Sequence, residues 1–232
     1  MLLGAGLLVA GGAFYLVARP TAQPGDSPSN PASGPASEAP PTDWEALRRE
    51  SARWMPDELK GVRLGITEEE LRKLRPTARP DVRGERPEEP YHWLVESLGG
   101  SEVRFAVSDE AGRLVRIQVL SKLPSLPALQ AHLAAMNERY GSVSGLWRCA
   151  TGDGLPTLRF TWRGHRVAVA DIVLIHPGGV SVTLDVAPDT LVGRSLQLGG
   201  CRPATREDLD QPLPVADPKA IQQRLQGRGP GR

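Results

Sequence analysis

The chain has 232 residues, of which 40% are hydrophobic, so it can bury one core of roughly 150 residues with both ends left over. Its 28 Lys and Arg residues nearly balance 27 Asp and Glu residues, which gives a formal charge of +1 at pH 7. Proteins that bind nucleic acid usually carry a strong positive field, so this balance gives no reason to expect a nucleic-acid partner.

Residues 1–18 contain no charged side chain, and Arg19 and Pro20 follow them. A helix of this length is just long enough to cross a hydrocarbon layer about 30 Å thick, so the segment predicts a membrane anchor or a signal peptide. We favour the anchor, because no basic residue precedes the apolar run, no Ala-x-Ala cleavage site follows it and no nearby cysteine could be acylated. Arg19 alone would argue for a cytoplasmic C-terminal side.

Residues 19–42 are rich in proline and serine and contain almost no bulky apolar side chain. Such a composition does not form a packed core, and the segment is predicted to be a disordered linker. Polyproline-like chain extends by about 3 Å per residue, so this linker could hold a domain up to roughly 70 Å from the membrane.

A globular domain is predicted over residues 43–205, beginning with a short helix of about ten residues. Thr42 and Glu45 have the capping-box spacing, and Trp44, Leu47 and Trp54 share one helical face.

The stretch from Gly61 to Leu74, GVRLGITEEELRKL, contains a second capping box. Thr67 and Glu70 are spaced so that hydroxyl and carboxylate each satisfy backbone N–H groups of the first helical turn. A helix is therefore predicted from Thr67 to Pro76, with its charged side in water.

This sequence motif resembles the opening of small bacterial envelope domains of the BamE/SmpA type, which share an α+β layout with the β-lactamase-inhibitor fold. The resemblance implies an assembly or inhibitor role in the envelope. The lipid-attachment cysteine usual in that group is absent here, so an outer-membrane location does not follow. The matching residues are Gly61, Leu64, Gly65, Ile66, Thr67, Glu70, Leu71 and Leu74.

The remaining pattern predicts an α+β domain in which a helix and an antiparallel meander occur twice. Residues 75–90 form a loop, and residues 126–140 form a helix capped by Ser125 and ended by Gly141. An internal duplication would explain the repeated order, and so would coincidence of a common α+β order. Strands are predicted at residues 91–97, 102–108, 113–120, 146–150, 157–163, 165–175 and 180–187.

Candidate catalytic chemistry is limited to one carboxylate. Asp171 interrupts an apolar strand face, and a buried carboxylate needs a partner or a raised pKa. A structural pair with an arginine or a strand bulge is one explanation, and a hydrolase that uses Asp171 with His165 or His92 is the other. His132, beside the apolar stripe of its helix, and His176, in a turn, are expected at the surface.

Cys149 and Cys201 are the two cysteines of the chain. In an oxidising compartment they are predicted to form a disulfide that ties the strand-like residues 195–198 and the segment after them to the sheet. In the cytosol both would be buried thiols. The histidines and cysteines lack metal-ligand spacing, and no sequence pattern predicts a metal or a cofactor.

If the apolar alternation faces the helices, a set of polar strand positions points the other way and could dock an acidic partner. The alternative is an ordinary solvated sheet face. The set comprises His92, Arg104, Arg116, Gln118, Arg159, Thr161, Arg163, Ser181, Thr183 and Asp185.

Residues 206–232 read as a polar tail, with a short helix opened by Asp217-Pro218 and closed by Gly227. The sequence as a whole predicts a non-catalytic, single-pass protein of the bacterial inner membrane. Its periplasmic domain would bind another envelope protein or a cell-wall component.

Overall fold

The computed structural model describes residues 43–81, 90–150, 156–176 and 178–205. These residues contain four α-helices, two 3-10 helices and nine strands. The α-helices are α1 (Trp44–Ser51), α2 (Glu68–Leu74), α3 (Leu126–Tyr140) and α4 (Asp189–Leu198), and the 3-10 helices are Ala52–Trp54 and Asp57–Leu59. The strands are β1 (Arg79–Pro80), β2 (Tyr91–Leu98), β3 (Ser101–Ser108), β4 (Leu114–Leu123), β5 (Gly145–Ala150), β6 (Pro156–Arg163), β7 (Val167–His176), β8 (Gly179–Pro188) and β9 (Arg202–Pro203).

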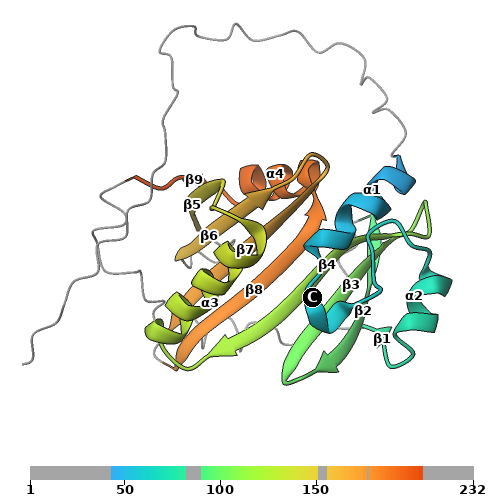
Figure 1. Ribbon diagram of the computed structural model, residues 1–232, viewed down its shortest axis with the longest axis horizontal. Helices are drawn as coiled ribbons and strands as arrows, with labels where there is room; N and C mark the ends of the chain where they lie inside the picture. The colour runs from blue at the N-terminus through green and yellow to red at the C-terminus, as the bar shows by residue number, and fades with distance from the viewer. Residues whose placement is uncertain (1–42, 82–89, 151–155, 177, 206–232) are drawn as a thin grey trace, which may run out of the picture. The chain divides into compact units, whose positions relative to one another are not determined.

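All nine strands form one antiparallel sheet in the order β1-β2-β3-β4-β8-β7-β6-β5-β9 (Figure 1). The two predicted meanders are therefore joined edge to edge, through pairing of β4 with β8 from Ile117 opposite Val186 to Leu123 opposite Val180. The predicted α+β class is confirmed.

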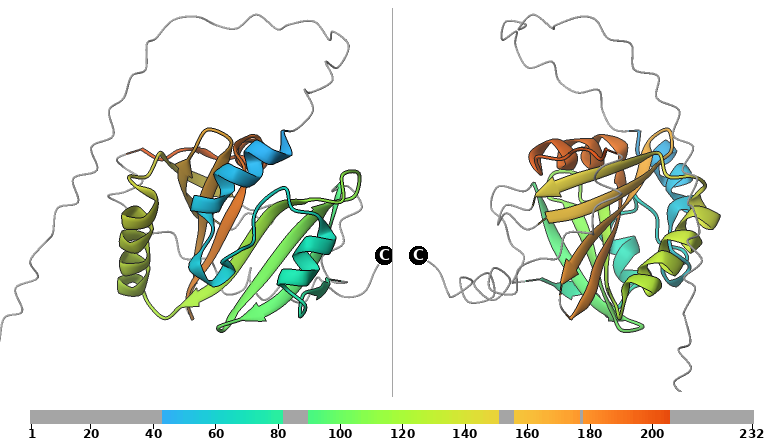
Figure 2. Two further views of the ribbon diagram at one scale, coloured as in Figure 1. Left: turned by 45° about the vertical axis from the view of Figure 1, so that its right-hand side comes forward. Right: turned by 90° about the vertical axis from the view of Figure 1, so that its left-hand side faces the viewer.

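Helices cover the two faces of the sheet unequally. Leu47 of α1, Leu71 of α2 and Met136 of α3 share one core cluster with Phe105 and Val169 of the sheet. On the opposite face α4 lies across one end only, where Val192 packs on alanines of β7 and β8 (Figure 2). The rest of that face is not covered by any described helix.

The N-cap of helix α1 lies one residue after the predicted one. Asp43, and not Thr42, is the N-cap, and its side chain accepts a hydrogen bond from the Ala46 N–H. The predicted apolar face is present: Leu47 and Trp54 are buried, and Trp44 packs against the same core.

Helix α2 has the predicted capping box, with the Thr67 hydroxyl accepting from the Glu70 N–H and the Glu70 carboxylate accepting from the Thr67 N–H. The glycine entry is also required by the structure. Gly65 has a φ of +84°, and a Cβ there would lie 2.9 Å from the Trp44 carbonyl oxygen. A side chain at this position would collide with the backbone of α1.

Helix α3 has the predicted bounds, with Ser125 as N-cap and Gly141 as C-cap. It carries the chain from β4 to β5 and packs its apolar stripe on the sheet. Near its C-terminal end the Tyr140 hydroxyl donates to the Trp54 carbonyl oxygen, which ties α3 to the segment after α1.

Two predictions about the edges of the domain are wrong. Residues 79 and 80, expected in a loop, pair with β2 as strand β1. Residues 195–198, expected to be strand-like, belong to helix α4, because Val192 and Leu196 are four residues apart and bury one helical side against the sheet.

In the described part of the chain, no helix is both long and apolar enough to span a bilayer. The predicted anchor at residues 1–18, the linker at residues 19–42 and the tail at residues 206–232 lie outside the described residues.

Candidate functional site

The polar sheet face predicted from the sequence lies on the side of α4. Successive cross-strand pairs place Arg104, Gln118, Asp185 and Thr161 in one row that crosses the sheet. The next row contains Thr183 and Arg159. Strand pairing thus brings most of the predicted residues together, although they come from four different strands.

His92 is the exception. It pairs with Val107 in the β2–β3 register, which places it on the opposite face, beside α2. There its Nδ1 lies 2.8 Å from Oδ1 of Asp109 and its Nε2 lies 3.2 Å from Oε2 of Glu68. The prediction that His92 belongs to the arginine-rich face is wrong. The side chains of β2 alternate in the opposite phase to the predicted one, so His92 points to the helix-covered face.

Arg116 is paired within the domain. Its Nε and Nη2 each donate to one carboxylate oxygen of Asp185 at 2.7 Å, and Asp185 is 2% exposed. Burial opposes the charge of Arg116, but the charge and hydrogen bonds of Asp185 outweigh burial and raise the guanidinium pKa. This pair is a buried structural element and does not present a free cation.

Arg104 of β3, on the same face and nearer the β1 edge of the sheet, is held in a similar way. It donates to Asp81, which is 3% exposed, and its Nε lies 3.2 Å from Oε1 of Glu102. Its guanidinium carbon also lies 5.6 Å from the centroid of the Trp93 ring. Two carboxylates and an aromatic ring therefore surround this cation.

The last two arginines of the predicted face contact α4. Arg159 donates from Nη1 to the Ser195 hydroxyl at 3.0 Å, and burial lowers its pKa. Arg163 lies 3.3 Å from Asp189 at the start of the helix. These contacts fasten α4 to the sheet at both ends, so the four arginines of this face contact groups of the domain itself.

The polar positions differ in accessibility. Thr161 is fully buried and donates to the Gly145 carbonyl oxygen, and Asp185 is buried beside Arg116. The residues farther from α4 are half-exposed and include three large aliphatic side chains. We call this surface the open face, and it consists of Gln118, Leu120, Ile172, Leu174, Ser181 and Thr183.

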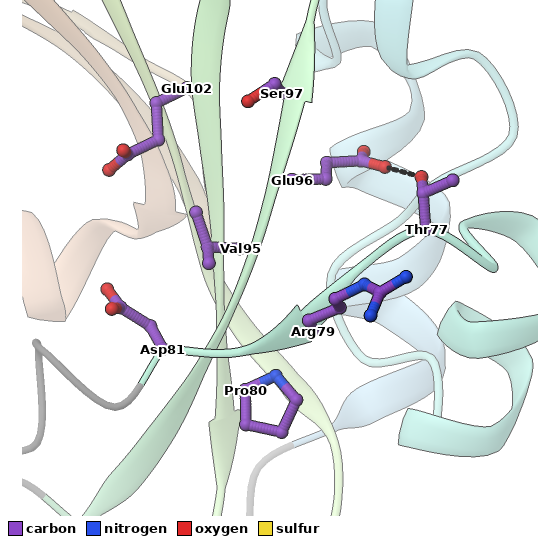
Figure 3. Close-up of a pocket in the computed structure, with 8 residues that line it drawn as sticks. All are labelled: Thr77, Arg79, Pro80, Asp81, Val95, Glu96, Ser97 and Glu102. Atoms are coloured by element: carbon purple, nitrogen blue, oxygen red, sulfur yellow. Dashed lines mark hydrogen bonds between the residues drawn. The ribbon is translucent and has the colours of Figure 1, made fainter.

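A cavity of about 380 Å³ lies at the β1 edge of the sheet. Figure 3 shows Glu96 directed toward Thr77, with Asp81 and Glu102 on the other side of Val95. Glu96 also accepts from Nε of Arg75 at 2.6 Å. The acidic groups that line the cavity thus already have basic or hydroxyl partners.

Asp171 is buried beneath α3, on the face opposite the open face. Its side chain is 0% exposed, and Oδ2 lies 2.8 Å from Nε2 of His132. The partner is neither an arginine nor His92 or His165. His132, expected at the surface, is half-buried, with 28% of its side chain exposed. A sequence signal was present, because His132 is three residues after Leu129 and four before Met136, a spacing typical of the buried helical side.

His165 and His176 have other surroundings. His165 is exposed, and its backbone N–H donates to Glu50. His176 is half-buried at the end of β7, where its Nε2 lies 3.1 Å from the Ser181 hydroxyl. Within the described residues no group of three or more metal-ligating side chains gathers.

The predicted disulfide is present. Cys149 in β5 and Cys201 after α4 are bonded, with their Cα atoms 4.1 Å apart. The bond holds the chain beside β5, where Arg202 and Pro203 form strand β9 opposite Arg148 and Trp147. Comparison of the chain with family models, with curated proteins and with solved structures gives no match in any of the three.

Proposed function

We propose that this chain is a non-catalytic membrane-anchored protein of the bacterial envelope. Residues 1–18 anchor it in the inner membrane, residues 19–42 act as a tether, and the folded domain lies in the periplasm. There the domain binds another envelope protein or a cell-wall component, in an assembly or inhibitor role.

The observation that carries this proposal is the open face. Helices α1, α2 and α3 cover one side of the sheet, and α4 covers one end of the other side. Leu120, Ile172 and Leu174 are left half-exposed among hydroxyl and amide side chains. Apolar groups framed by polar ones on a rigid sheet are typical of a protein-binding surface.

The two edge strands of the sheet are poorly suited to docking, which favours the open face as the docking surface. Strands β1 and β9 lie at the two edges, and each consists of an arginine followed by a proline, Arg79–Pro80 and Arg202–Pro203. Proline has no N–H to donate to an added strand, so both edges are poor templates for strand addition.

The chemistry of the described residues also favours binding over hydrolysis. Asp171, the carboxylate on which the hydrolase alternative rests, is sealed from solvent and bonded to His132. The disulfide agrees with an oxidising compartment such as the periplasm. The two joined helix-and-meander units agree with the α+β layout of the β-lactamase-inhibitor fold that the BamE/SmpA resemblance implies.

Site-specific photo-crosslinking in intact membranes tests the proposal. A photoreactive residue at Thr183, on the open face, is expected to capture an envelope partner. The matched control is the same residue at Gln130, which is exposed on α3 at the opposite side of the sheet. Equal capture from both positions, or from neither, would count against the open face as a binding surface.

A further inference from the structure

The carboxylate of Asp171 is buried with one polar neighbour. Oδ2 bonds to His132, while Oδ1 has no hydrogen-bond partner among the described residues. The cross-strand neighbours of Asp171 on the same face are Phe160 of β6 and Leu184 of β8, both apolar. Among the described residues, the charge of Asp171 is therefore balanced from α3 alone.

The titratable groups that act on this site also lie on α3. His132 donates the hydrogen bond, and Tyr140 feels the charge of Asp171, although burial is the main reason why its pKa rises to about 12. Arg139 in the same turn is engaged elsewhere, with the Met55 carbonyl oxygen and Asp57. The sheet contributes apolar side chains at the positions opposite Asp171.

We propose that the His132–Asp171 pair is a one-proton latch that holds α3 on the sheet at neutral and mildly acidic pH and releases it in alkaline solution. With its proton the pair is neutral as a whole, and α3 covers the Asp171 carboxylate completely while the His132 side chain stays 28% exposed. When the proton leaves to solvent, a carboxylate without a balancing cation stays beneath α3. Hydrating that charge requires the helix to move away.

Release of α3 would uncover a defined part of the core. Leu129 of the helix packs with Leu158, Val173 and Val182 of the sheet in one cluster. Leu133 contacts both this cluster and the main core, and Met136 belongs to the main core. Release of α3 would therefore expose the first cluster and the edge of the main core around Met136, while α1 and α2 still cover the rest of the main core.

The direction of the pH effect follows from both members of the pair. Burial raises the pKa of Asp171, with the His132 hydrogen bond opposing it, and the hydrogen bond to Asp171 raises the pKa of His132, with burial opposing it. Because the pKa of each group is raised in the closed form, the closed form binds protons more tightly than the open form. Closed α3 is thus fully favoured below the ordinary histidine pKa of about 6.5 and loses that advantage as pH rises through the raised value.

Hydrogen exchange of the full-length chain from about pH 6 to pH 10 measures this latch. After correction for the intrinsic exchange rate, opening of α3 should increase up to about tenfold per pH unit above the pKa of the pair, since one proton is released. Amides of β3 serve as the internal reference. Asp171→Asn removes the buried carboxylate at nearly constant shape and should abolish the increase of α3 opening with rising pH.

Two control variants keep the pH dependence if the proposal is right. His165→Gln removes an exposed histidine, and Tyr140→Phe removes the other titratable group that senses Asp171. An α3 that opens no more than β3, or a retained slope in Asp171→Asn, would overturn the latch. If Asp171→Asn does not fold, NMR titration of the His132 ring in the wild-type chain decides, and a midpoint at or below about 6.5 would overturn it.

Discussion

Arg116 on β4 and Asp185 on β8 are joined by two hydrogen bonds of 2.7 Å across the strand pair that connects the two meanders. Both side chains are mostly buried, with 15% and 3% exposed. A bidentate pair at this position fixes the register between the two halves of the sheet. Its role is structural, although arginines on a sheet face suggested docking.

Removing one partner of this pair should be costly, because it leaves the other charge buried. We expect Asp185→Leu alone and Arg116→Met alone each to lower the free energy of unfolding by about 3 kcal/mol. The double variant Arg116→Met/Asp185→Leu should stay within about 1 kcal/mol of the wild type. Urea unfolding of the wild type, both single variants and the double variant forms a complete cycle. A loss in the double variant equal to the sum of the single losses would contradict the pairing.

The disulfide closes a sequence separation of 52 residues between Cys149 and Cys201. In the chain-entropy model a loop of this size contributes about 4 kcal/mol to stability. Reduction should therefore lower stability by that order and loosen β9 and the end of α4 first, because the bond ties them to β5. Hydrogen exchange with and without reductant reports the order of loosening. Equal loosening of all strands would show that the bond has no local role.

Sequence signals between neighbouring residues predicted much of the fold, but contacts between residues far apart in the sequence were not predicted. The capping box at Thr67 and the bounds of α3 follow from residues a few positions apart. The pair of Arg116 with Asp185 spans 69 positions, and that of His132 with Asp171 spans 39. Nothing within a sequence window specifies such partners, since they depend on strand order and on which helix covers which face.

The contrast between local and long-range information also explains which residues of the candidate site were predicted correctly. Alternation of residues along β3, β4, β6 and β8 placed most of the polar face correctly, because side chains of a strand alternate between faces. His92 was misplaced because the phase of β2 is set by its pairing with β3. The neutralising roles of Asp81 and Asp189 were missed because both lie outside the predicted strands.

Glu50 should give the domain an acid-sensitive contact. Its carboxylate accepts hydrogen bonds from the N–H groups of His165 and Arg166, between β6 and β7, and of Val167, the first residue of β7. Burial raises its pKa, but these three bonds outweigh burial, so the pKa lies below the ordinary value. A depressed pKa gives stability that is present above the ordinary glutamate pKa of about 4.3 and is lost as pH falls through the lower folded value.

Glu50→Gln tests that contact. Because Glu50 is partly exposed, the variant should lose at most about 1 kcal/mol of stability at pH 7 relative to the wild type, and the difference should shrink as the pH falls below about 4.3. Glu69→Gln is the matched control, because Glu69 is exposed and pairs with Lys73 on the surface of α2. Thermal unfolding across this pH range provides the measurement. A constant difference between Glu50→Gln and wild type at all pH values would exclude the carboxylate as its cause.

The proposed location makes a separate prediction. Alkaline phosphatase folds to an active enzyme in the periplasm, where its own disulfides form. A fusion after Arg232 should therefore be active in cells. An expressed but inactive fusion would place the domain on the cytoplasmic side, as Arg19 alone suggests, and would remove the oxidising environment that the disulfide requires.

The central claim is that the open face binds an envelope partner, and a single charge at its centre tests it most directly. Ile172→Glu adds a carboxylate to the open face at a partly buried position, with Thr183 and Arg159 as its cross-strand neighbours. We expect recovery of the partner crosslinked from Thr183 to fall by about tenfold or more, because a charged carboxylate must be desolvated on binding. Gln130→Glu, on the opposite side of the sheet, should leave recovery unchanged. Equal recovery of the partner with Ile172→Glu and with wild type, in domains of equal stability, would contradict the account.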